Sequence, residues 1–184
     1  MKESEKKVPL VGCEGFPYKG IRLRHELYSV PMIQEIVKDF NPGLIIEFGC
    51  QYGGLTLALN DIVPDAEIFA YDINIDDRYF IKEKIVIPDK IHFKQMNLLE
   101  NYPIKEIVNL CEDRRRKFLY CDNGSKKFEL KYGQFLNSND MIGCHDWGVE
   151  LAEGDVVNTL KDFKPFKHDI FYKNGFRTRL WLKR

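Results

Sequence analysis

Short apolar runs alternate with longer amphipathic stretches along most of the chain. The apolar runs have the length of β-strands, and the stretches between them repeat their apolar residues with the period of an α-helix. The predicted strands are Leu44–Phe48, Glu67–Ile73, Ile91–Met96, Lys117–Asp122 and Met141–His145. The predicted helices are Val30–Phe40, Gly54–Val63, Asp76–Val86, Pro103–Arg115, Lys126–Leu136 and Asp155–Phe163.

The strands are apolar along nearly their whole length, which is typical of a parallel sheet that helices cover on both faces. Near the end of the chain, Asn174-Gly175 separates two strand-like runs in "HDIFYKNGFRTRLWLKR", a pattern typical of a β-hairpin. We therefore predict an α/β fold, a doubly wound and mostly parallel sheet of about seven strands that ends in an antiparallel hairpin. We expect one domain over residues 1–184, with residues 1–40 as an arm and helix covering the cleft and residues 44–184 as the core.

Composition adds three expectations. The 28 Lys and Arg residues balance the 28 Asp and Glu residues, whereas nucleic-acid-binding proteins usually carry a basic excess, so we expect no nucleic-acid partner. The five cysteines are odd in number and lack metal-binding spacing, which suits a reducing compartment. The sequence has no run of roughly 20 apolar residues and no signal-peptide pattern, so we expect a soluble, cytoplasmic protein without a membrane partner.

The stretch "LIIEFGCQYGGL" runs from the first core strand into a glycine-rich turn, at the usual ligand site of such a sheet. Gly49 and Gly54 match the first and third glycines of the dinucleotide fingerprint G-x-G-x-x-G. Gln51, however, stands where the second glycine admits a pyrophosphate. A glutamine side chain would obstruct that approach, so an NAD(P)-dependent oxidoreductase is the less favoured alternative.

S-adenosylmethionine carries no phosphate, and its ribose diol and sulfonium suit acidic or polar neighbours. Glu47 stands just before the turn, and Asp72 ends the second strand, where a carboxylate can accept two hydrogen bonds from a ribose diol. Asn97, after the third strand, is placed to meet an adenine amine. The alternative is that Glu47 and Asp72 only cap the helices that follow them.

The segment "IIEFGCQYGG…YDIN", with an antiparallel final hairpin, resembles the class I S-adenosylmethionine-dependent methyltransferases. In particular it resembles the cephalosporin-hydroxylase-like and macrolide-sugar O-methyltransferases, whose E-x-G-x-x-x-G-G turn follows a P-x-x-I-I-E segment, here Pro42 to Glu47. The resemblance implies methylation of a small hydroxylated acceptor, for example a sugar. It implies a cofactor site formed by Glu47, Gly49, Gln51, Gly53, Gly54, Asp72, Asn97 and Asp122.

Two later strands each run into an aspartate, in "KFLYCDNGSKKFE" and "DMIGCHDWG". Asp122 and Asp146 should therefore lie at the same edge of the sheet, and two converging carboxylates need a positive partner. In the related O-methyltransferases this partner is a divalent cation, and the resemblance implies Mg²⁺ on Asp122 and Asp146, with His145 beside them. The alternative is that Asp122 faces the sulfonium and Asp146 merely begins the next loop.

Lys126 and His145 are candidate general bases. Lys126 lies four residues after Asp122, near where catechol-type enzymes place a lysine base, and a histidine can titrate near working pH. Equally, Lys126 can be solvated and His145 can be a hydrogen-bonded structural group.

The N-terminal segment leaves two roles open. Phe16, Tyr18, His25 and Tyr28 can line the acceptor pocket, or the segment can pack across the sheet edge or against a second subunit of a homo-oligomer. A non-catalytic binding subunit with a methyltransferase fold is the third functional alternative, and the intact glycine turn weighs against it.

Overall fold

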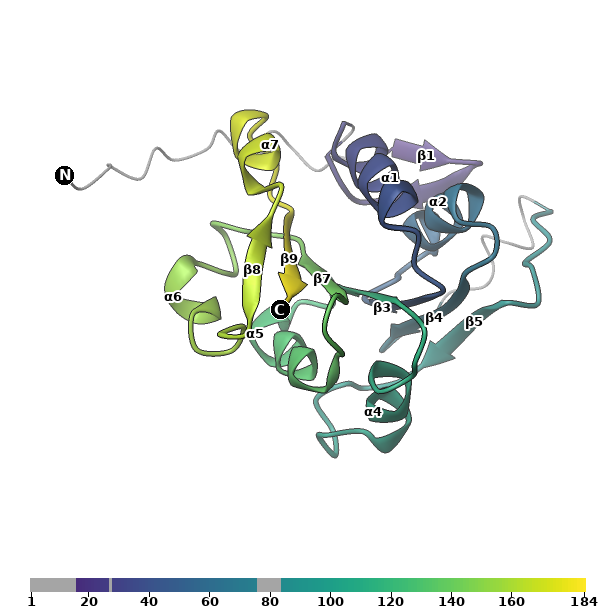
Figure 1. The fold of residues 1–184 in the computed structure, drawn as a ribbon. Helices are drawn as coiled ribbons and strands as arrows, with labels where there is room; N and C mark the ends of the chain where they lie inside the picture. Colours follow the sequence, from purple (N-terminus) through teal and green to yellow (C-terminus); the bar gives the residue numbers. More distant parts are fainter. Residues whose placement is uncertain (1–15, 27, 76–83) are drawn as a thin grey trace.

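A seven-stranded sheet is the central layer of the protein, seen in a computed structural model that describes residues 16–26, 28–75 and 84–184 (Figure 1). Its spatial order is β5-β4-β3-β6-β7-β9-β8, and β9 runs antiparallel to both β7 and β8, while the other pairs are parallel. The predicted α/β fold with a mostly parallel sheet is confirmed. The strands are β3 (Leu44–Phe48), β4 (Glu67–Asp72), β5 (Ile91–Gln95), β6 (Lys117–Cys121), β7 (Met141–Cys144), β8 (Phe163–Phe166) and β9 (Arg179–Lys183).

Helices cover both faces of this sheet (Figure 1). One face packs against α1 (Ser29–Phe40) and α2 (Gly54–Ile62), and the other against α4 (Lys105–Cys111), α5 (Lys126–Glu129) and the 3₁₀ helix η1 (Leu130–Phe135). Alternate side chains of a strand enter opposite cores, as Ile45 does on the α1 side and Leu44 and Ile46 do on the α4 side. A separate hairpin, β1 (Phe16–Tyr18) and β2 (Ile21–Leu23), packs beside α2, and α6 (Glu153–Val156) and α7 (His168–Lys173) accompany β8 and β9.

The chain changes direction across the sheet between β3 and β6. Strands β3 to β5 are laid down toward one edge, and β6 and β7 toward the other, so β3 and β6 flank the point where the order reverses. Ligands bind at the carboxyl ends of the strands at such a point. Gly49, after β3, has a φ of +86° and lies against the backbone of Asp122, after β6, so closely that a Cβ would meet the Asp122 oxygen at 2.3 Å. The architecture thus brings the glycine turn and Asp122 together.

The predicted terminal hairpin is right in direction but wrong in position. The run before Asn174 is not a strand but the helix α7, and the antiparallel partners of β9 are β7 and β8. The Asn174 side chain and backbone N–H both donate to the oxygen of Ile170, and Gly175 has a φ of +69°, so the pair ends a helix. Asn-Gly serves left-handed backbone in hairpin turns and at helix ends alike, and the sequence pattern did not separate the two.

Several helices are shorter than predicted. The stretch Lys126–Leu136 divides into α5 and η1, and the predicted helix Asp155–Phe163 gives way to α6, turns and the start of β8. Most of the predicted helix Asp76–Val86 lies outside the described residues. No helix in the described part of the chain is long and apolar enough to cross a membrane.

Candidate functional site

The turn after β3 is held by the neighbouring strand β4. The Gly49 N–H donates to the oxygen of Tyr71 at 2.7 Å, and the Gln51 N–H donates to Asp72 Oδ2 at 2.8 Å. Gln51 itself has a φ of +46°, a left-handed conformation that aims its amide at the carboxylate. The other Asp72 oxygen accepts the Asn74 N–H at 3.0 Å. Asp72 therefore joins two turns at the carboxyl edge of the sheet through the amides of Gln51 and Asn74.

Glu47, near the end of β3, is buried beside this turn. The side chain is 1% exposed and accepts a hydrogen bond from the Thr56 hydroxyl at 2.6 Å. Burial raises the pKa of Glu47 to about 8; the Thr56 hydrogen bond opposes this, and the charges of Asp122 and Asp72 add to it. Glu47 is thus a largely protonated group at neutral pH, buried beside the turn and bound to Thr56 of α2.

The N-terminal segment covers the open side of the turn. A Cβ on Gly54 would lie 2.8 Å from the backbone oxygen of Arg22 and 2.9 Å from the side chain of Leu23. A cavity of only about 20 Å³ remains between this segment and the turn. It opens beside a larger polar cavity of about 400 Å³, within the usual size of small-ligand sites. Its lining includes Arg24, Gln51, Asp122, Lys126, His145 and Asp146.

The edge beyond Asp72 presents two apolar side chains to solvent. Ile73 follows β4 and is 56% exposed, and Leu99, in the turn after β5, is 53% exposed. The Asn97 amide is engaged nearby, because its Nδ2 donates to Glu100 at 2.8 Å and its Oδ1 accepts the Leu99 N–H at 3.1 Å. Asn97 therefore shapes this turn, and Ile73 and Leu99 are exposed apolar side chains among the described residues of this edge.

Lys126, the first residue of α5, lies among three carboxylates. Its Nζ is 3.2 Å from Asp122 Oδ1, 3.0 Å from Asp146 Oδ2 and 2.9 Å from Glu150 Oε2, and the side chain is 2% exposed. Burial alone would lower the pKa of Lys126, but the charge of Asp122 and the bonds to Glu150 and Asp146 raise it above the ordinary value. The group is a permanent ammonium here, which weighs against its predicted role as a base.

His145, at the end of β7, faces carboxylates through both ring nitrogens. Its Nε2 is 3.1 Å from Glu26 Oε2, and its Nδ1 is 3.3 Å from Asp146 Oδ1 and 3.5 Å from Asp122 Oδ1. Burial alone would lower the pKa of His145, but its bonds to Asp122, Asp146 and Glu26 outweigh burial and raise it. A doubly donating imidazolium has no lone pair for a proton or a metal, so its roles as base and ligand stay predictions that this geometry does not favour.

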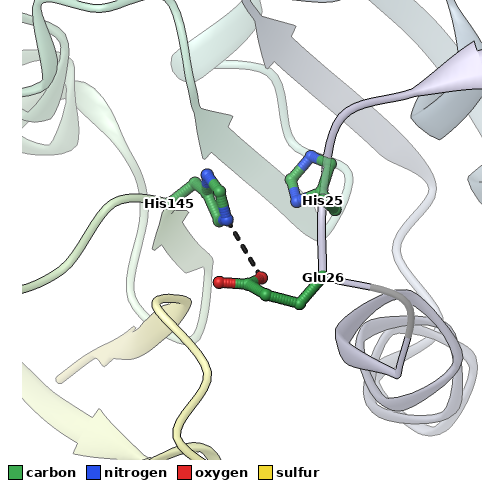
Figure 2. A group of neighbouring side chains, drawn as sticks. All are labelled: His25, Glu26 and His145. Atoms are coloured by element: carbon green, nitrogen blue, oxygen red, sulfur yellow. Dashed lines mark hydrogen bonds and ion pairs between the residues drawn. The ribbon is translucent and has the colours of Figure 1, made fainter. Parts of the chain in front are cut away.

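His25 and Glu26 reach this cluster from the segment that leads into α1. Figure 2 shows both side chains facing His145, with the bond between His145 and Glu26 drawn as a dashed line. The rings of His25 and His145 lie 4.4 Å apart. Burial lowers the pKa of His25, the charge of His145 lowers it further, and Asp122, 3.3 Å from its Nε2, opposes both. His25 is therefore neutral beside a charged histidine, and its buried Nδ1 has no hydrogen-bond partner among the described residues.

Sequence reasoning missed three residues that organise this site. Glu26 accepts Arg177 Nε at 3.0 Å, and Arg177 Nη1 lies 3.1 Å from Asp146, so segments 151 residues apart in sequence meet here. Glu129, fully buried, accepts the N–H groups of Asn123 and Ser125 and so fixes the loop after β6. The sequence around these residues shows neither a motif nor a spacing that predicts such long-range contacts.

Two groups of side chains could be considered for a metal, namely His25, Glu26 and His145, and Asp122, His145 and Asp146. Within each group, the candidate ligand atoms lie within 4.8 Å of one another. His145 belongs to both groups, and both its nitrogens are engaged with carboxylates. The Mg²⁺ predicted for Asp122 and Asp146 does not fit this arrangement, because the Lys126 ammonium already lies between the two carboxylates.

A second cavity, of about 520 Å³, is lined by Trp147, the residue after Asp146. Trp147, Trp181 and His168 form a group of touching rings in its wall, and Arg179 lies over Trp147 with its guanidinium carbon 5.7 Å from the ring centre. The wall of this cavity is thus rich in aromatic side chains, whereas charged side chains of both signs line the cavity beside it.

Comparisons with known proteins point to methyltransferases. No family model matches the sequence. By sequence, the chain is similar to a tRNA (guanine-N(7)-)-methyltransferase from Candida glabrata. The two are 24% identical over 136 residues, which cover 71% of this chain and 47% of the relative. A similar match is the enzyme of that name from Eremothecium gossypii, 22% identical over 124 residues (64% and 43%). The chain spans less than half the length of these curated relatives.

Solved structures give the fold. The apo structure of CmcI superposes with a TM-score of 0.66 at 13% identity, over 91% of this chain and 76% of CmcI. CmcI with Mg and SAM has a TM-score of 0.63 at 13% identity, over 92% and 76%. A methyltransferase from Geobacter sulfurreducens has a TM-score of 0.57 at 13% identity, over 85% and 78%. The architecture that the sequence resemblance implied is confirmed.

The expectation of a small-molecule acceptor and no nucleic-acid partner is wrong, because the curated proteins that this sequence matches are named for the methylation of tRNA. The expectation relied on a net charge of zero. Net charge does not record where the cations lie, and here Arg22, Arg24 and Arg177 all line the cavities at the carboxyl edge of the sheet.

Proposed function

We propose that this chain, which has the class I methyltransferase fold, transfers the methyl group of S-adenosylmethionine. The observation that carries the proposal is the hydrogen bond from the Gln51 N–H to Asp72. In a dinucleotide site, the amides of such a turn are free to bind a phosphate. Here the amide is bound to a carboxylate, and a diphosphate would meet a fixed negative charge. The same acid suits a ligand with a ribose diol and a positive charge, which disfavours the NAD(P) alternative.

Different residues of this edge are suited to bind different parts of the methyl donor. Among the described residues, each Asp72 oxygen accepts one backbone N–H, which leaves a lone pair for a ribose hydroxyl. Ile73 and Leu99 offer exposed apolar surface to the adenine ring. Asp122 is held ionised: burial alone would raise its pKa, but His145 and His25 lower it below its usual range, so it can face the sulfonium. When bound, S-adenosylmethionine supplies an electrophilic methyl group, and the protein's part is to align it with the acceptor.

The acceptor we propose is a ring nitrogen of a nucleobase in RNA. Lys126 and His145 are both held in their protonated forms by carboxylates, so neither is available to remove a proton. A ring nitrogen such as guanine N7 attacks through a lone pair and has no proton to lose. The names of the curated relatives support this class of acceptor, and the exposed Arg22 and Arg24 beside the cavities suit a phosphate backbone.

O-methylation is the second candidate, and His25 is the observation that favours it. A hydroxyl acceptor must lose its proton, and His25 is a neutral imidazole whose buried Nδ1 lacks a hydrogen-bond partner in the described chain. His25 also borders the small cavity beside the glycine turn. A base with a lowered pKa is a weak one, which is why we rank this candidate second.

Two measurements test the proposal. Isothermal titration with S-adenosylhomocysteine and with NADH should show binding of the first ligand alone; binding of NADH alone contradicts the cofactor assignment, and binding of neither revives the non-catalytic alternative. Incubation with S-adenosylmethionine and total tRNA, followed by nuclease digestion and mass spectrometry, should reveal a base-methylated nucleoside. A ribose-methylated product would instead support the O-methylation candidate. The Asp72→Asn variant is the matched comparison for both measurements, since it removes the charge of Asp72 and keeps the shape of the site.

A further inference from the structure

The centre between Asp122 and Asp146 already holds a cation that belongs to the chain. Lys126 begins α5 directly after the loop that carries Asp122, and Asp146 and Glu150 lie on the loop after β7. The Lys126 side chain is 2% exposed. Its Nζ lies 3.2 Å from Asp122, 3.0 Å from Asp146 and 2.9 Å from Glu150. A buried ammonium with three carboxylate neighbours is fixed in place by the fold and is not a mobile surface group.

Every carboxylate oxygen of the aspartate pair has a nitrogen of this chain beside it. An Mg²⁺ ion needs such oxygens at about 2.0–2.1 Å in a nearly octahedral shell. The contacts are Lys126 at 3.2 Å and His145 at 3.5 Å on Asp122 Oδ1, His25 at 3.3 Å on Asp122 Oδ2, His145 at 3.3 Å and Arg177 at 3.1 Å on Asp146 Oδ1, and Lys126 at 3.0 Å on Asp146 Oδ2.

The charges of the cluster argue in the same direction. Two converging carboxylates repel one another and need a positive partner, and Lys126 supplies that charge from between them. A divalent ion bound to the same oxygens would lie within a few ångströms of the Lys126 ammonium, with like charges facing one another in a buried setting. The ion and the ammonium therefore compete for one place.

We infer that Lys126 takes the place that a divalent cation would hold between Asp122 and Asp146, and that this centre works without a metal. Lys126 is a positioning residue: it holds the two carboxylates together at the edge where the methyl donor and acceptor would meet. That last statement rests on the proposed function, whereas the competition between lysine and metal does not. The two can therefore be tested separately.

The wild-type protein gives the first test. Titration with Mn²⁺, followed by electron paramagnetic resonance of the free ion, should show no saturable site, and neither Mn²⁺ nor EDTA should change the melting temperature. Saturable Mn²⁺ binding that the Asp146→Asn variant loses would overturn the inference. This result needs neither catalysis nor a folded lysine variant.

The Lys126→Ala variant gives the second test. Removing the ammonium takes away the cation that Asp122, Asp146 and Glu150 share, and His145 and Arg177 remain on the two aspartates. The variant should therefore melt below the wild type without metal, and millimolar Mn²⁺ should restore much of the loss. We expect it to bind a single Mn²⁺ ion at least about tenfold more tightly than the wild type. Lys127→Ala is the matched control, because it removes the same charge from the next residue, 64% exposed and paired with Asp155, and should gain no Mn²⁺ site.

Three other outcomes would each overturn the inference: equal Mn²⁺ binding by the wild type and Lys126→Ala, weaker binding by the variant, or binding by neither. In the last case no cation site exists for the lysine to occupy. If Lys126→Ala does not fold, Lys126→Gln keeps a polar side chain and removes the charge, and the same Mn²⁺ comparison applies. Failure of S-adenosylhomocysteine to bind the wild type would refute the proposed function and leave the metal result standing.

Discussion

Replacing Glu47 with glutamine should remove a large part of the pH dependence of folding stability. Glu47 is 1% exposed beside the glycine turn, and its carboxyl group accepts a hydrogen bond from the Thr56 hydroxyl. Glutamine has nearly the same shape and can accept the same hydrogen bond through its oxygen, but it does not titrate. The comparison therefore isolates the charge of one buried group.

The size of the effect follows from the pKa. The ordinary value of 4.5 is raised to about 8 by burial, against the Thr56 hydrogen bond and with the charges of Asp122 and Asp72. One pKa unit corresponds to 1.36 kcal/mol, so the protonated form stabilises the folded state by about 5 kcal/mol relative to the ionised form. Because the folded pKa is raised, this stability is fully present below pH 4.5 and is lost as the pH rises through about 8.

Urea denaturation followed by circular dichroism at pH 5, 7 and 9 gives the required free energies. The difference between wild type and Glu47→Gln should change by about 4 kcal/mol between pH 5 and pH 9, because part of the effect lies below pH 5, and the variant should be the more stable at pH 9. Groups that titrate in both proteins cancel in this difference. Glu35→Gln, an exposed change on α1, serves as the control for a lost surface charge. If the free energies of unfolding of wild type and Glu47→Gln changed in parallel with pH, the neutral state of Glu47 would be refuted, together with the buried position on which it depends.

Three further changes test other parts of the site and the fold. Asp72→Asn should weaken S-adenosylhomocysteine binding roughly 10- to 100-fold in calorimetry, the loss of one charge-assisted hydrogen bond, and an unchanged affinity would exclude a direct contact. Lys117→Met should cost about 3–5 kcal/mol in urea denaturation, because Asp140, 2.8 Å away and 3% exposed, would stay buried without its partner; a cost below about 1 kcal/mol would contradict this. Gly54→Ala should cost about 1–3 kcal/mol, since the new Cβ lies 2.8 Å from a backbone oxygen of β2, whereas Gly154→Ala has open space and should be nearly neutral; equal effects would contradict the close packing of β2 on the turn.

The sequence predicted those elements whose local pattern of apolar residues matches their burial in the fold. Strands β3 and β6 are continuous apolar runs, and the structure buries each of them completely, so an apolar pattern was enough to find them. The tail around Asn174 was misread because the same two residues end a helix as readily as they turn a hairpin. Here the deciding factor is the packing of the buried Phe171 against the rest of the fold, and a local pattern does not contain it.

In the candidate site, too, local features were predictable from the sequence and long-range contacts were not. Asp72, Asp122 and Asp146 were predictable because each follows a strand, and parallel strands end at one edge. Their partners were not predictable, since Glu26 and Arg177 reach the cluster from segments 151 residues apart. The sequence also located Lys126 four residues after Asp122 and His145 next to Asp146, but not the contacts that they make with these carboxylates. Spacing therefore located the residues at the strand ends but not their long-range partners.

The architecture also explains how so many acids are stable at one edge. In a parallel sheet, the carboxyl ends of the strands meet the amino ends of the following helices, where backbone N–H groups lack partners. In this protein, amides of the loops between strand and helix donate to carboxylates: Gln51 and Asn74 donate to Asp72, and Asn123 and Ser125 donate to Glu129. The Gln51 amide of the glycine turn is therefore bound to an acid of the protein itself, where dinucleotide-binding proteins direct such amides at a phosphate. An edge built in this way would disfavour a diphosphate and suits the sulfonium of the proposed methyl donor, because the Gln51 amide is already bound to Asp72.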